Sequence, residues 1–469
     1  MSAKPSLLIR GATIVTMNDD FDIVPDGELL IEKGRIASVG CASDRPVGWR
    51  QSKADRVIEA SGCAVLPGLV NAHNHAAMSL FRGYADDLPL MRWLEDRIWP
   101  LEAELDEDSI CAGTALAVLE MIRGGTTAFA DMYFMMDKVA AVVKRAGMRA
   151  VLARGLAGTG SEPMAGIEET RELAAKWHKG AGGRIRVAVG PHAPYTCEPE
   201  LLRRLAALAR ELKLPVHTHV AETRDEIKII EERYGATPVQ YLEREGLFDG
   251  LRVTAAHCVH LSDDDVKILA DRRVGVVHCP GSNLKLAAGI APLAKLLEAG
   301  VQVGLGTDGP ASAGALDMWE QMRLAANLQK ALTGQADVVT ARQVLAMATC
   351  GGARVIGLSG HVGAIIPGMA ADVIIVNLER AHLYPPHDVV SALVYAGHPD
   401  DVQTVIVAGE PIMEERLVLN LDERDILATA AAEAAKLVKA AAAKQAAKHA
   451  TPEPGGSDDN DEDPPEQSG

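Results

Sequence analysis

The chain has 469 residues, of which 48% are hydrophobic and 24% charged, and its formal net charge is −17. This composition supports a large buried core and excludes a chain that is disordered overall. The acidic balance argues against a nucleic-acid or anionic-membrane surface, and no apolar run is long enough to span a bilayer. The seven cysteines are scattered without a C-x-x-C pair, which is typical of reduced thiols. We therefore expect a soluble, cytoplasmic protein that binds neither nucleic acid nor membrane.

Residues 1–65 are expected to form the N-terminal part of a β-domain. Turn signals, among them Asn18-Asp19-Asp20 and Asp26-Gly27, separate short stretches that have the composition of strands. The strands predicted here are Leu7–Met17, Gly27–Lys33, Arg35–Val39 and Arg56–Glu59.

Residues 66–360 alternate between short apolar strands and longer helical patterns, such as Pro199–Leu212, Ser262–Asp271 and Ile290–Ala299. Eight strand–helix units predict an α/β fold, a TIM-like (β/α)₈ barrel, because parallel strands need crossover helices and eight strands close the sheet. We expect this barrel to bind a metal. The eight predicted strands are Val65–Asn71, Thr126–Asp131, Arg149–Arg154, Ile185–Gly190, Pro215–His219, Arg252–His257, Gly275–His278 and Gln302–Thr307.

Residues 361–425 return to strand patterns, at Ala371–Leu378, Val402–Val407 and Arg416–Leu419. Because strand-rich segments flank the barrel on both sides, we predict that residues 1–65 and 361–425 meet as one small β-sandwich domain. Residues 426–450 are rich in Ala and Lys and predict a helix. Residues 451–469 are acidic, contain several prolines and predict a disordered tail.

The carboxyl ends of the predicted barrel strands collect histidines and acidic residues, and reactive groups lie at this end of such barrels. The first strand runs into His73-Asn74-His75, whose two imidazoles lie on one side of an extended segment because side chains alternate. Such a pair can hold a borderline metal ion such as zinc, and a third imidazole with one carboxylate completes the site. His219 ends the fifth strand and Asp308 follows the eighth. The sequence therefore predicts a metal site formed by His73, His75, His219 and Asp308.

Longer motifs around these residues resemble the metal-dependent amidohydrolase superfamily, over roughly residues 5–420. Within it they look like the 5-methylthioadenosine/S-adenosylhomocysteine deaminases, which have triazine hydrolases as relatives. The motifs are Pro67-Gly68-Leu69-Val70-Asn71-Ala72-His73-Asn74-His75, Leu80-Phe81-Arg82-Gly83-Tyr84-Ala85-Asp86-Asp87-Leu88, His217-x-His219-x-x-Glu222-Thr223, Ala255-Ala256-His257-Cys258-Val259-His260, Ser282-Asn283-Leu284-Lys285-Leu286 and Gly306-Thr307-Asp308-Gly309.

The resemblance implies a catalytic role for three residues. Asp308 would accept a proton from a water that the metal has activated. Glu222, three residues after His219, would protonate a ring nitrogen of the substrate and later the departing amine. His257 would orient the hydroxide or stabilise the charged intermediate. The alternative interpretation of Glu222 is a carboxylate at a helix N-terminus, which the helix dipole favours.

The resemblance also implies substrate-binding residues. Glu102 matches the position that holds ribose hydroxyls, Arg154 matches one that contacts the far end of the nucleoside, and His192 matches a substrate contact. Glu222 and Asp308 would face the substrate as well. The structural alternative for Glu102 is a solvated glutamate on a helix. For Arg154 it is a salt-bridged surface arginine, and for His192 a packed histidine.

The sequence thus predicts a hydrolase that acts on C–N bonds in cyclic amidines, a zinc-dependent deaminase of methylthioadenosine, S-adenosylhomocysteine or adenosine. Relatives with two metals carry a lysine on the fourth strand, and its absence here favours one ion per subunit, with ferrous iron as the alternative to zinc. By the same resemblance, members that act on S-adenosylhomocysteine would carry a second arginine after the third strand. Residues 157–170 contain none and Arg171 is the first, which favours substrates without homocysteine. A triazine or other heterocycle aminohydrolase or chlorohydrolase and a non-catalytic scaffold remain alternatives, and a homo-oligomer is compatible with the fold. Because only 4% of residues are aromatic, we expect little stacking on the ligand.

Overall fold

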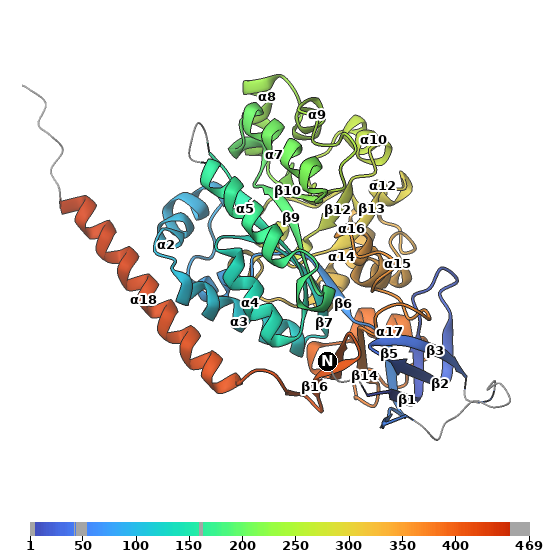
Figure 1. The fold of residues 1–469 in the computed structure, drawn as a ribbon. Helices are drawn as coiled ribbons and strands as arrows, with labels where there is room; N and C mark the ends of the chain where they lie inside the picture. The colour runs from blue at the N-terminus through green and yellow to red at the C-terminus, as the bar shows by residue number, and fades with distance from the viewer. Residues whose placement is uncertain (1–4, 42, 44–53, 159–162, 451–469) are drawn as a thin grey trace, which may run out of the picture.

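The computed structural model describes residues 5–41, 43, 54–158 and 163–450, and it contains the predicted eight-stranded parallel barrel (Figure 1). The strands follow one another around the barrel in chain order. Between the last strand and the first, the Asp308 backbone N–H donates to the His73 carbonyl at 3.0 Å, and the Thr307 N–H donates to Asn71 Oδ1 at 3.0 Å. The barrel strands are β6 (Leu69–Asn74), β7 (Thr126–Tyr133), β8 (Arg149–Leu156), β9 (Ile185–Pro191), β10 (Val216–Val220), β11 (Val253–His257), β12 (Gly275–His278) and β13 (Gln302–Leu305).

Helices cover the outside of the barrel and connect its strands. Helix α7 has the predicted bounds and shows the reason for its formation, because Leu201, Leu205 and Leu208 form one buried face while Arg203 and Arg204 stay exposed. The α-helices between β6 and β14 are α1 (Leu90–Trp93), α2 (Trp99–Glu102), α3 (Glu107–Arg123), α4 (Met136–Ala146), α5 (Pro163–Trp177), α6 (Gly180–Gly183), α7 (Pro199–Leu212), α8 (Arg224–Tyr234), α9 (Pro238–Arg244), α10 (Asp263–Asp271), α11 (Pro280–Lys285), α12 (Leu293–Glu298), α13 (Pro310–Ala313), α14 (Met318–Thr333), α15 (Ala341–Ala346) and α16 (Gly352–Val355). Short 3₁₀ and π helices lie among them: η3 (Ala76–Phe81), η4 (Leu94–Ile98), η5 (Pro194–Thr196) and η6 (Met347–Gly351).

The two chain ends form one nine-stranded sheet, so the small β-domain does contain both of them, beside the barrel (Figure 1). Strand β1 pairs antiparallel with β2 and parallel with β4 and β5. Strand β14 pairs antiparallel with β5 and thereby joins the C-terminal strands to the N-terminal ones. The helix α17 (Val389–Ala396) lies between β14 and β15. The strands are β1 (Leu7–Val15), β2 (Ile23–Glu32), β3 (Arg35–Cys41), β4 (Arg56–Glu59), β5 (Cys63–Pro67), β14 (Val373–Asn377), β15 (Val402–Val407), β16 (Glu410–Glu414) and β17 (Leu417–Val418).

The single predicted strand Val65–Asn71 is in fact parts of two strands, because the chain passes from the β-domain into the barrel at Gly68. A Cβ atom at Gly68 would lie 2.1 Å from the side chain of Thr127, so this crossing needs glycine. The Gly68 N–H donates to the Asp372 carbonyl at 3.0 Å. Arg149, the first residue of β8, also binds the buried Asp372 carboxylate through Nε and Nη2, at 2.9 and 3.0 Å. Asp372 therefore ties the β-domain to the amino end of the barrel.

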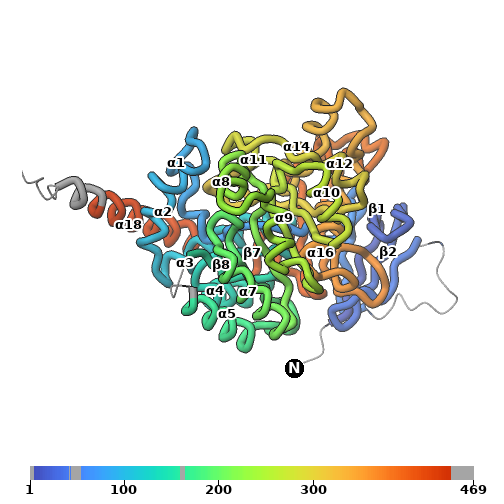
Figure 2. The backbone as a smooth tube through the Cα atoms, turned by 90° about the horizontal axis from the view of Figure 1, so that it is seen from above, coloured from blue at the N-terminus to red at the C-terminus, as the bar shows by residue number. Residues whose placement is uncertain are grey.

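The predicted Ala-rich helix is α18 (Glu423–Ala450), which begins slightly earlier than the sequence suggested. It runs along α3 and α2 and projects past the barrel on the side away from the β-domain (Figures 1 and 2). Lys436 pairs with Asp106 and Lys444 pairs with Glu104, so charged side chains anchor the helix. In the part of the chain that the structure describes, no helix is long and apolar enough to cross a membrane. The predicted acidic tail, 451–469, lies outside the described residues.

Candidate active site

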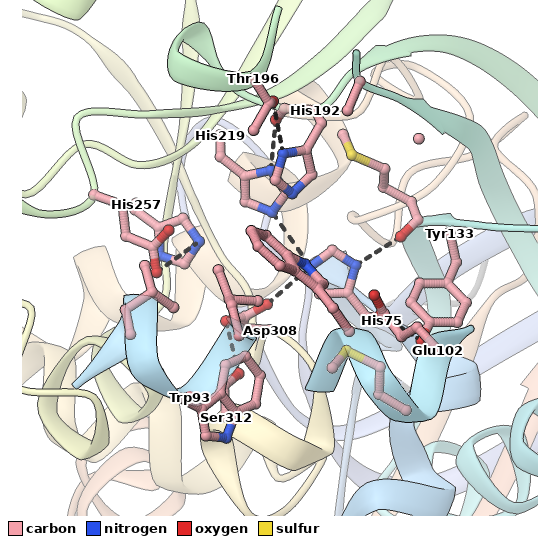
Figure 3. A pocket seen from close by; sticks show the side chains of 18 of the residues that line it. His75, Trp93, Glu102, Tyr133, His192, Thr196, His219, His257, Asp308 and Ser312 are labelled. Carbon is pink, nitrogen blue, oxygen red and sulfur yellow. Dashed lines mark hydrogen bonds and ion pairs between the residues drawn. The ribbon is translucent and has the colours of Figure 1, made fainter. Parts of the chain in front are cut away.

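A pocket opens at the carboxyl ends of the barrel strands, where the sequence predicts the reactive groups (Figure 3). His75, His219, His257 and Asp308 lie in this pocket together with Glu222. They come from β10 and β11 and from the segments that follow β6, β10 and β13, which are far apart in the sequence. The fold therefore gathers the predicted metal ligands and the predicted acid–base residues in one place.

The four predicted metal ligands meet around one centre. His75 Nε2 lies 3.2 Å from His219 Nε2 and 3.2 Å from Asp308 Oδ1, and His73 Nε2 lies 3.3 Å from the same oxygen. Figure 3 shows His75, His219 and Asp308 pointing toward one another. His73 Nε2 is buried without a hydrogen-bond partner, which is unfavourable unless another group binds it. Three imidazoles and one carboxylate are a donor set that fits a divalent transition metal at this centre.

In each of the three histidines, Nδ1 contacts a group that is not one of the predicted metal ligands. His75 Nδ1 and His219 Nδ1 lie 2.6 and 2.7 Å from backbone carbonyl oxygens, and His73 Nδ1 lies 2.8 Å from His217 Nε2. These contacts turn each Nε2 toward the centre. Burial lowers the pKa of His73 to about 4 and that of His219 well below its usual value. Both rings are therefore neutral, which is the form that binds metal ions.

Asp308 is held so that one oxygen faces the histidines. Its backbone is in the left-handed region, with φ of 65°. The hydroxyls of Ser282 and Ser312 donate to Oδ2 at 2.6 and 2.8 Å, which leaves Oδ1 beside His73 and His75. Burial opposes ionisation, but the adjacent imidazoles of His73 and His75 hold the pKa of Asp308 well below its usual value. The carboxylate is thus ionised and oriented toward the centre.

Glu222 and His257 lie beside the predicted metal ligands and close to each other, with His257 Nε2 3.9 Å from Glu222 Oε1. His257 Nδ1 lies 2.9 Å from Asn283 Oδ1, and its Nε2 is buried without a hydrogen-bond partner. The Glu226 carboxylate accepts the backbone N–H groups of Ala221 and Glu222 at 2.8 Å and fixes the turn. Burial raises the pKa of Glu222 and favours the protonated form, which can donate a proton.

Comparison with known proteins identifies the family. The sequence profile of the amidohydrolase family matches residues 64–412, more than half of the chain. The chain belongs to this family. It is 50% identical over 433 residues to the 5-methylthioadenosine/S-adenosylhomocysteine deaminase of Pelotomaculum thermopropionicum, a match that covers 92% of this chain and 99% of that relative.

Solved structures of similar proteins support the same assignment. An adenosine deaminase from Xanthomonas campestris with bound zinc has a TM-score of 0.87 and 36% identity, over 92% of this chain and 98% of that chain. An atrazine chlorohydrolase from Arthrobacter aurescens, complexed with zinc, has a TM-score of 0.84 and 27% identity, over 91% of this chain and 100% of that chain. Both structures are consistent with an amidohydrolase fold in this chain and with a divalent metal in its site.

The pocket wall of this amidohydrolase is more aromatic than its composition suggested. Glu102 lies in the wall, where the Tyr133 hydroxyl donates to its Oε1 at 2.7 Å, and burial raises the pKa of Glu102 (Figure 3). Although aromatic residues are only 4% of the chain, folding brings several of them to the pocket. The wall therefore contains more aromatic side chains than the composition suggested. The aromatic lining residues are Trp93, Trp99, Tyr133, Phe134 and Tyr195.

The two remaining predicted substrate residues differ in position. His192 lines the pocket, and its Nδ1 lies 2.9 Å from the Thr196 hydroxyl. Arg154 is not among the lining residues, because its Nε pairs with Glu169 at 2.6 Å while its guanidinium lies 5.0 Å from the Phe134 ring centroid. Phe134 is itself part of the wall. Arg154 therefore lies one layer behind the pocket surface.

The sequence did not single out the residues that orient the predicted ones. The available signals were a shared motif for Ser282 and Asn283, which lie in α11, and a position at the end of β7 for Tyr133. His217 had no assigned role, and its contact with His73 joins residues that are far apart in the sequence. Two other histidines are structural in this fold. His260 Nε2 binds the Ala288 carbonyl at 2.7 Å, and His278 is buried at the end of β12. The residues missed in this way are Tyr133, Thr196, His217, Ser282, Asn283 and Ser312.

Proposed function

We propose that this amidohydrolase is a hydrolytic deaminase of adenine-type nucleosides, with 5-methylthioadenosine, S-adenosylhomocysteine or adenosine as substrate. The products are the inosine-type nucleoside and ammonia. The observation that carries the proposal is a buried carboxyl group, Glu222, which is not a metal ligand and lies beside the ring of ligands with a raised pKa. A deaminase needs such a group to protonate the ring. The names of the relative from Pelotomaculum thermopropionicum and the structure from Xanthomonas campestris support this substrate class.

The metal would be one zinc ion per chain, held by His73, His75, His219 and Asp308. Ferrous iron suits the same nitrogen and oxygen donors and is the alternative ion. When bound, zinc supplies a water whose pKa is lowered toward neutrality. The zinc in the two solved structures of similar proteins supports the choice of ion.

The residues of the chain would move the protons. Asp308 would accept a proton from the attacking water, and Glu222 would donate one to the ring nitrogen next to the amine-bearing carbon. His257 Nε2, which lacks a protein partner, would hydrogen-bond the oxygen as it adds to that carbon. The bond from carbon to the amine then breaks. The two protons of the water finish on the ring nitrogen and on the departing ammonia, carried by Glu222 and Asp308.

Three further residues would position the nucleoside. The Glu102 carboxylate can accept from two neighbouring ribose hydroxyls at once, and Tyr133 holds it in place. His192 would contact the substrate from the wall. Arg154 would reach the far end of the nucleoside after leaving Glu169, since its side chain is 20% exposed.

The test is ammonia release by the metal-loaded protein with methylthioadenosine, S-adenosylhomocysteine, adenosine, guanine and aminotriazines. Turnover of a nucleoside is expected, and turnover of none would overturn the substrate class. Activity on triazines alone would instead support a heterocycle hydrolase, which the likeness to the atrazine chlorohydrolase makes the second candidate. All seven cysteines are free, which is typical of a reducing compartment, and we place the enzyme in the cytoplasm.

A further inference from the structure

A second cavity lies at the opposite end of the barrel from the active site. Its lining comes from the amino end of β9, the segments that precede β10 and β11, and Gly357 after α16. The cavity has a volume of about 540 Å³, which is large enough for a small organic anion. Its lining residues are Val151, His178, Lys179, Arg186, Ala209, Arg210, Lys213, Leu214, Pro215, Gly250, Leu251, Arg252, Ile356 and Gly357. None of them lines the catalytic pocket.

The lining is strongly basic although the chain as a whole is acidic. It contains five Lys and Arg side chains and one histidine but neither Asp nor Glu. Within the described residues, none of these five cations has a carboxylate oxygen within 4.0 Å, whereas many other Lys and Arg side chains have one. In a protein with a net charge of −17, such a concentration of unneutralised positive charge needs an explanation. The five cations are Lys179, Arg186, Arg210, Lys213 and Arg252.

The arginines are held in place without being neutralised. Arg186 donates to the Gly357 carbonyl at 2.7 Å, Arg252 donates to a backbone carbonyl at 3.3 Å, and Arg210 donates to two. Arg186 Nε is buried without a hydrogen-bond partner. Burial, together with the charges of Arg149 and Arg252, lowers the pKa of Arg186. A bound anion would relieve this repulsion and satisfy the free donor.

The two lysines of the cavity lie next to helix ends. Lys213 follows α7 with φ of 53°, and Lys179 precedes α6 with φ of 64°, both in the left-handed region. At the carboxyl ends of α4, α8 and α14, the position that Lys213 occupies after α7 is a glycine. The helix dipole accounts for a cation at the end of α7, but it does not account for Arg186 and Arg252 at the strands.

We propose that this basic cavity is an anion site that binds a phosphate group, either as inorganic phosphate or on a small phosphorylated metabolite. Guanidinium and ammonium groups together form charge-assisted hydrogen bonds with phosphate oxygens. The apolar part of the lining, among it Val151, Leu214 and Ile356, would accept the non-phosphate part of a metabolite. The site is separate from the deaminase site, so its occupancy does not depend on the proposed catalytic function.

The test is calorimetric titration of the metal-loaded full chain with inorganic phosphate, pyrophosphate and ribose 5-phosphate at constant ionic strength. We expect saturable binding of at least one of them below about 10 mM. The variants Arg186→Gln and Lys213→Asn should each weaken it by about tenfold or more, because each removes one charged donor. Tighter binding of ribose 5-phosphate than of phosphate would identify a metabolite as the source, and equal binding would identify the free ion.

Lys213→Asn also separates binding from folding, because asparagine tolerates the left-handed conformation. We expect its thermal midpoint without phosphate to match or exceed that of the original chain. Lys267→Gln, which removes an exposed cation on α10, is the matched control and should bind phosphate unchanged. The proposal is overturned if no phosphate compound shows saturable binding. It is also overturned if both cavity variants bind as the control does, since phosphate would then occupy another site.

Discussion

The two ends of the barrel hold their charged side chains in different ways. At the carboxyl ends, charged and polar groups face one another, and His75 lies 3.2 Å from both His219 and Asp308. At the amino ends each arginine is held by a group of the protein, since Arg149 binds a buried carboxylate and Arg186 binds a backbone carbonyl. At the carboxyl ends the geometry suits one shared ion, whereas at the amino end the pair of Arg149 and Asp372 joins the barrel to the β-domain.

The largest effect on turnover is expected when one of the proposed metal ligands is replaced. Asp308→Ala removes the anionic ligand, so the site should lose its metal, and turnover should fall by about 10⁴-fold. Elemental analysis and ammonia release measure the two quantities on the same sample. His278→Asn changes a buried histidine at the end of the neighbouring strand and should keep the metal. Full metal content with full turnover in the Asp308 variant would show that these ligands are not the chemical centre.

A smaller loss of turnover is expected when only proton transfer is removed. Glu222→Gln keeps the shape of the side chain but removes its acid–base function, so kcat should fall by about 10²- to 10⁴-fold. The metal content should stay unchanged, because Glu222 is not one of the ligands. The control is Asp225→Asn, which changes an exposed side chain three residues after Glu222. It should leave kcat unchanged. Loss of metal from the Glu222 variant would make this residue a part of the ligand ring instead.

The position of the ligands could be predicted from the sequence because it depends on local rules. The spacing of His73 and His75 and the rule that reactive groups lie at strand ends are sufficient to bring them near His219 and Asp308. The orienting contacts could not be predicted in this way. The contact of His73 with His217 and the pair Arg149–Asp372 join distant segments, and their geometry depends on side-chain directions that no local pattern contains.

The same limit applies to the β-domain boundary. The apolar run Val65–Asn71 predicted one strand, but its pattern does not show that the chain changes sheets at Gly68. Only the close approach to Thr127 in the folded chain shows why glycine is needed there. The aromatic wall illustrates the same point, since composition counts residues and does not show where they gather.

Recognition of the sugar should have a moderate effect. Glu102→Ala removes the carboxylate in the wall, so kcat/KM for nucleosides should fall by about 10- to 100-fold, as expected for hydrogen bonds to a charged group. Adenine as the free base should lose little, because it carries no ribose hydroxyls. Tyr133→Phe removes only the hydroxyl that holds Glu102 and should cause a smaller loss.

Glu95→Ala, an exposed change in the preceding segment, is the control for the wall. Steady-state kinetics measure kcat/KM for a nucleoside and for its free base, and the ratio of these two values tests ribose recognition. Equal losses for both substrates in Glu102→Ala would show that the carboxylate supports the pocket as a whole and does not recognise ribose.

The smallest effect on turnover is expected at the amino end, where stability should change instead. Arg149 and Asp372 have exposed side-chain fractions of 7% and 1%, so Arg149→Met leaves a buried carboxylate without its cation. Loss of one partner of a buried pair costs about 3–5 kcal/mol of unfolding free energy. Urea denaturation measures this loss, while turnover per folded molecule should change by less than about twofold, since the pair lies at the far end of the barrel from the pocket. Arg149→Met combined with Asp372→Asn should recover part of the stability, because the uncompensated charge is then gone. A double variant no more stable than Arg149→Met would show that the hydrogen bonds of Asp372 to the backbone, and not its charge, hold the β-domain to the barrel.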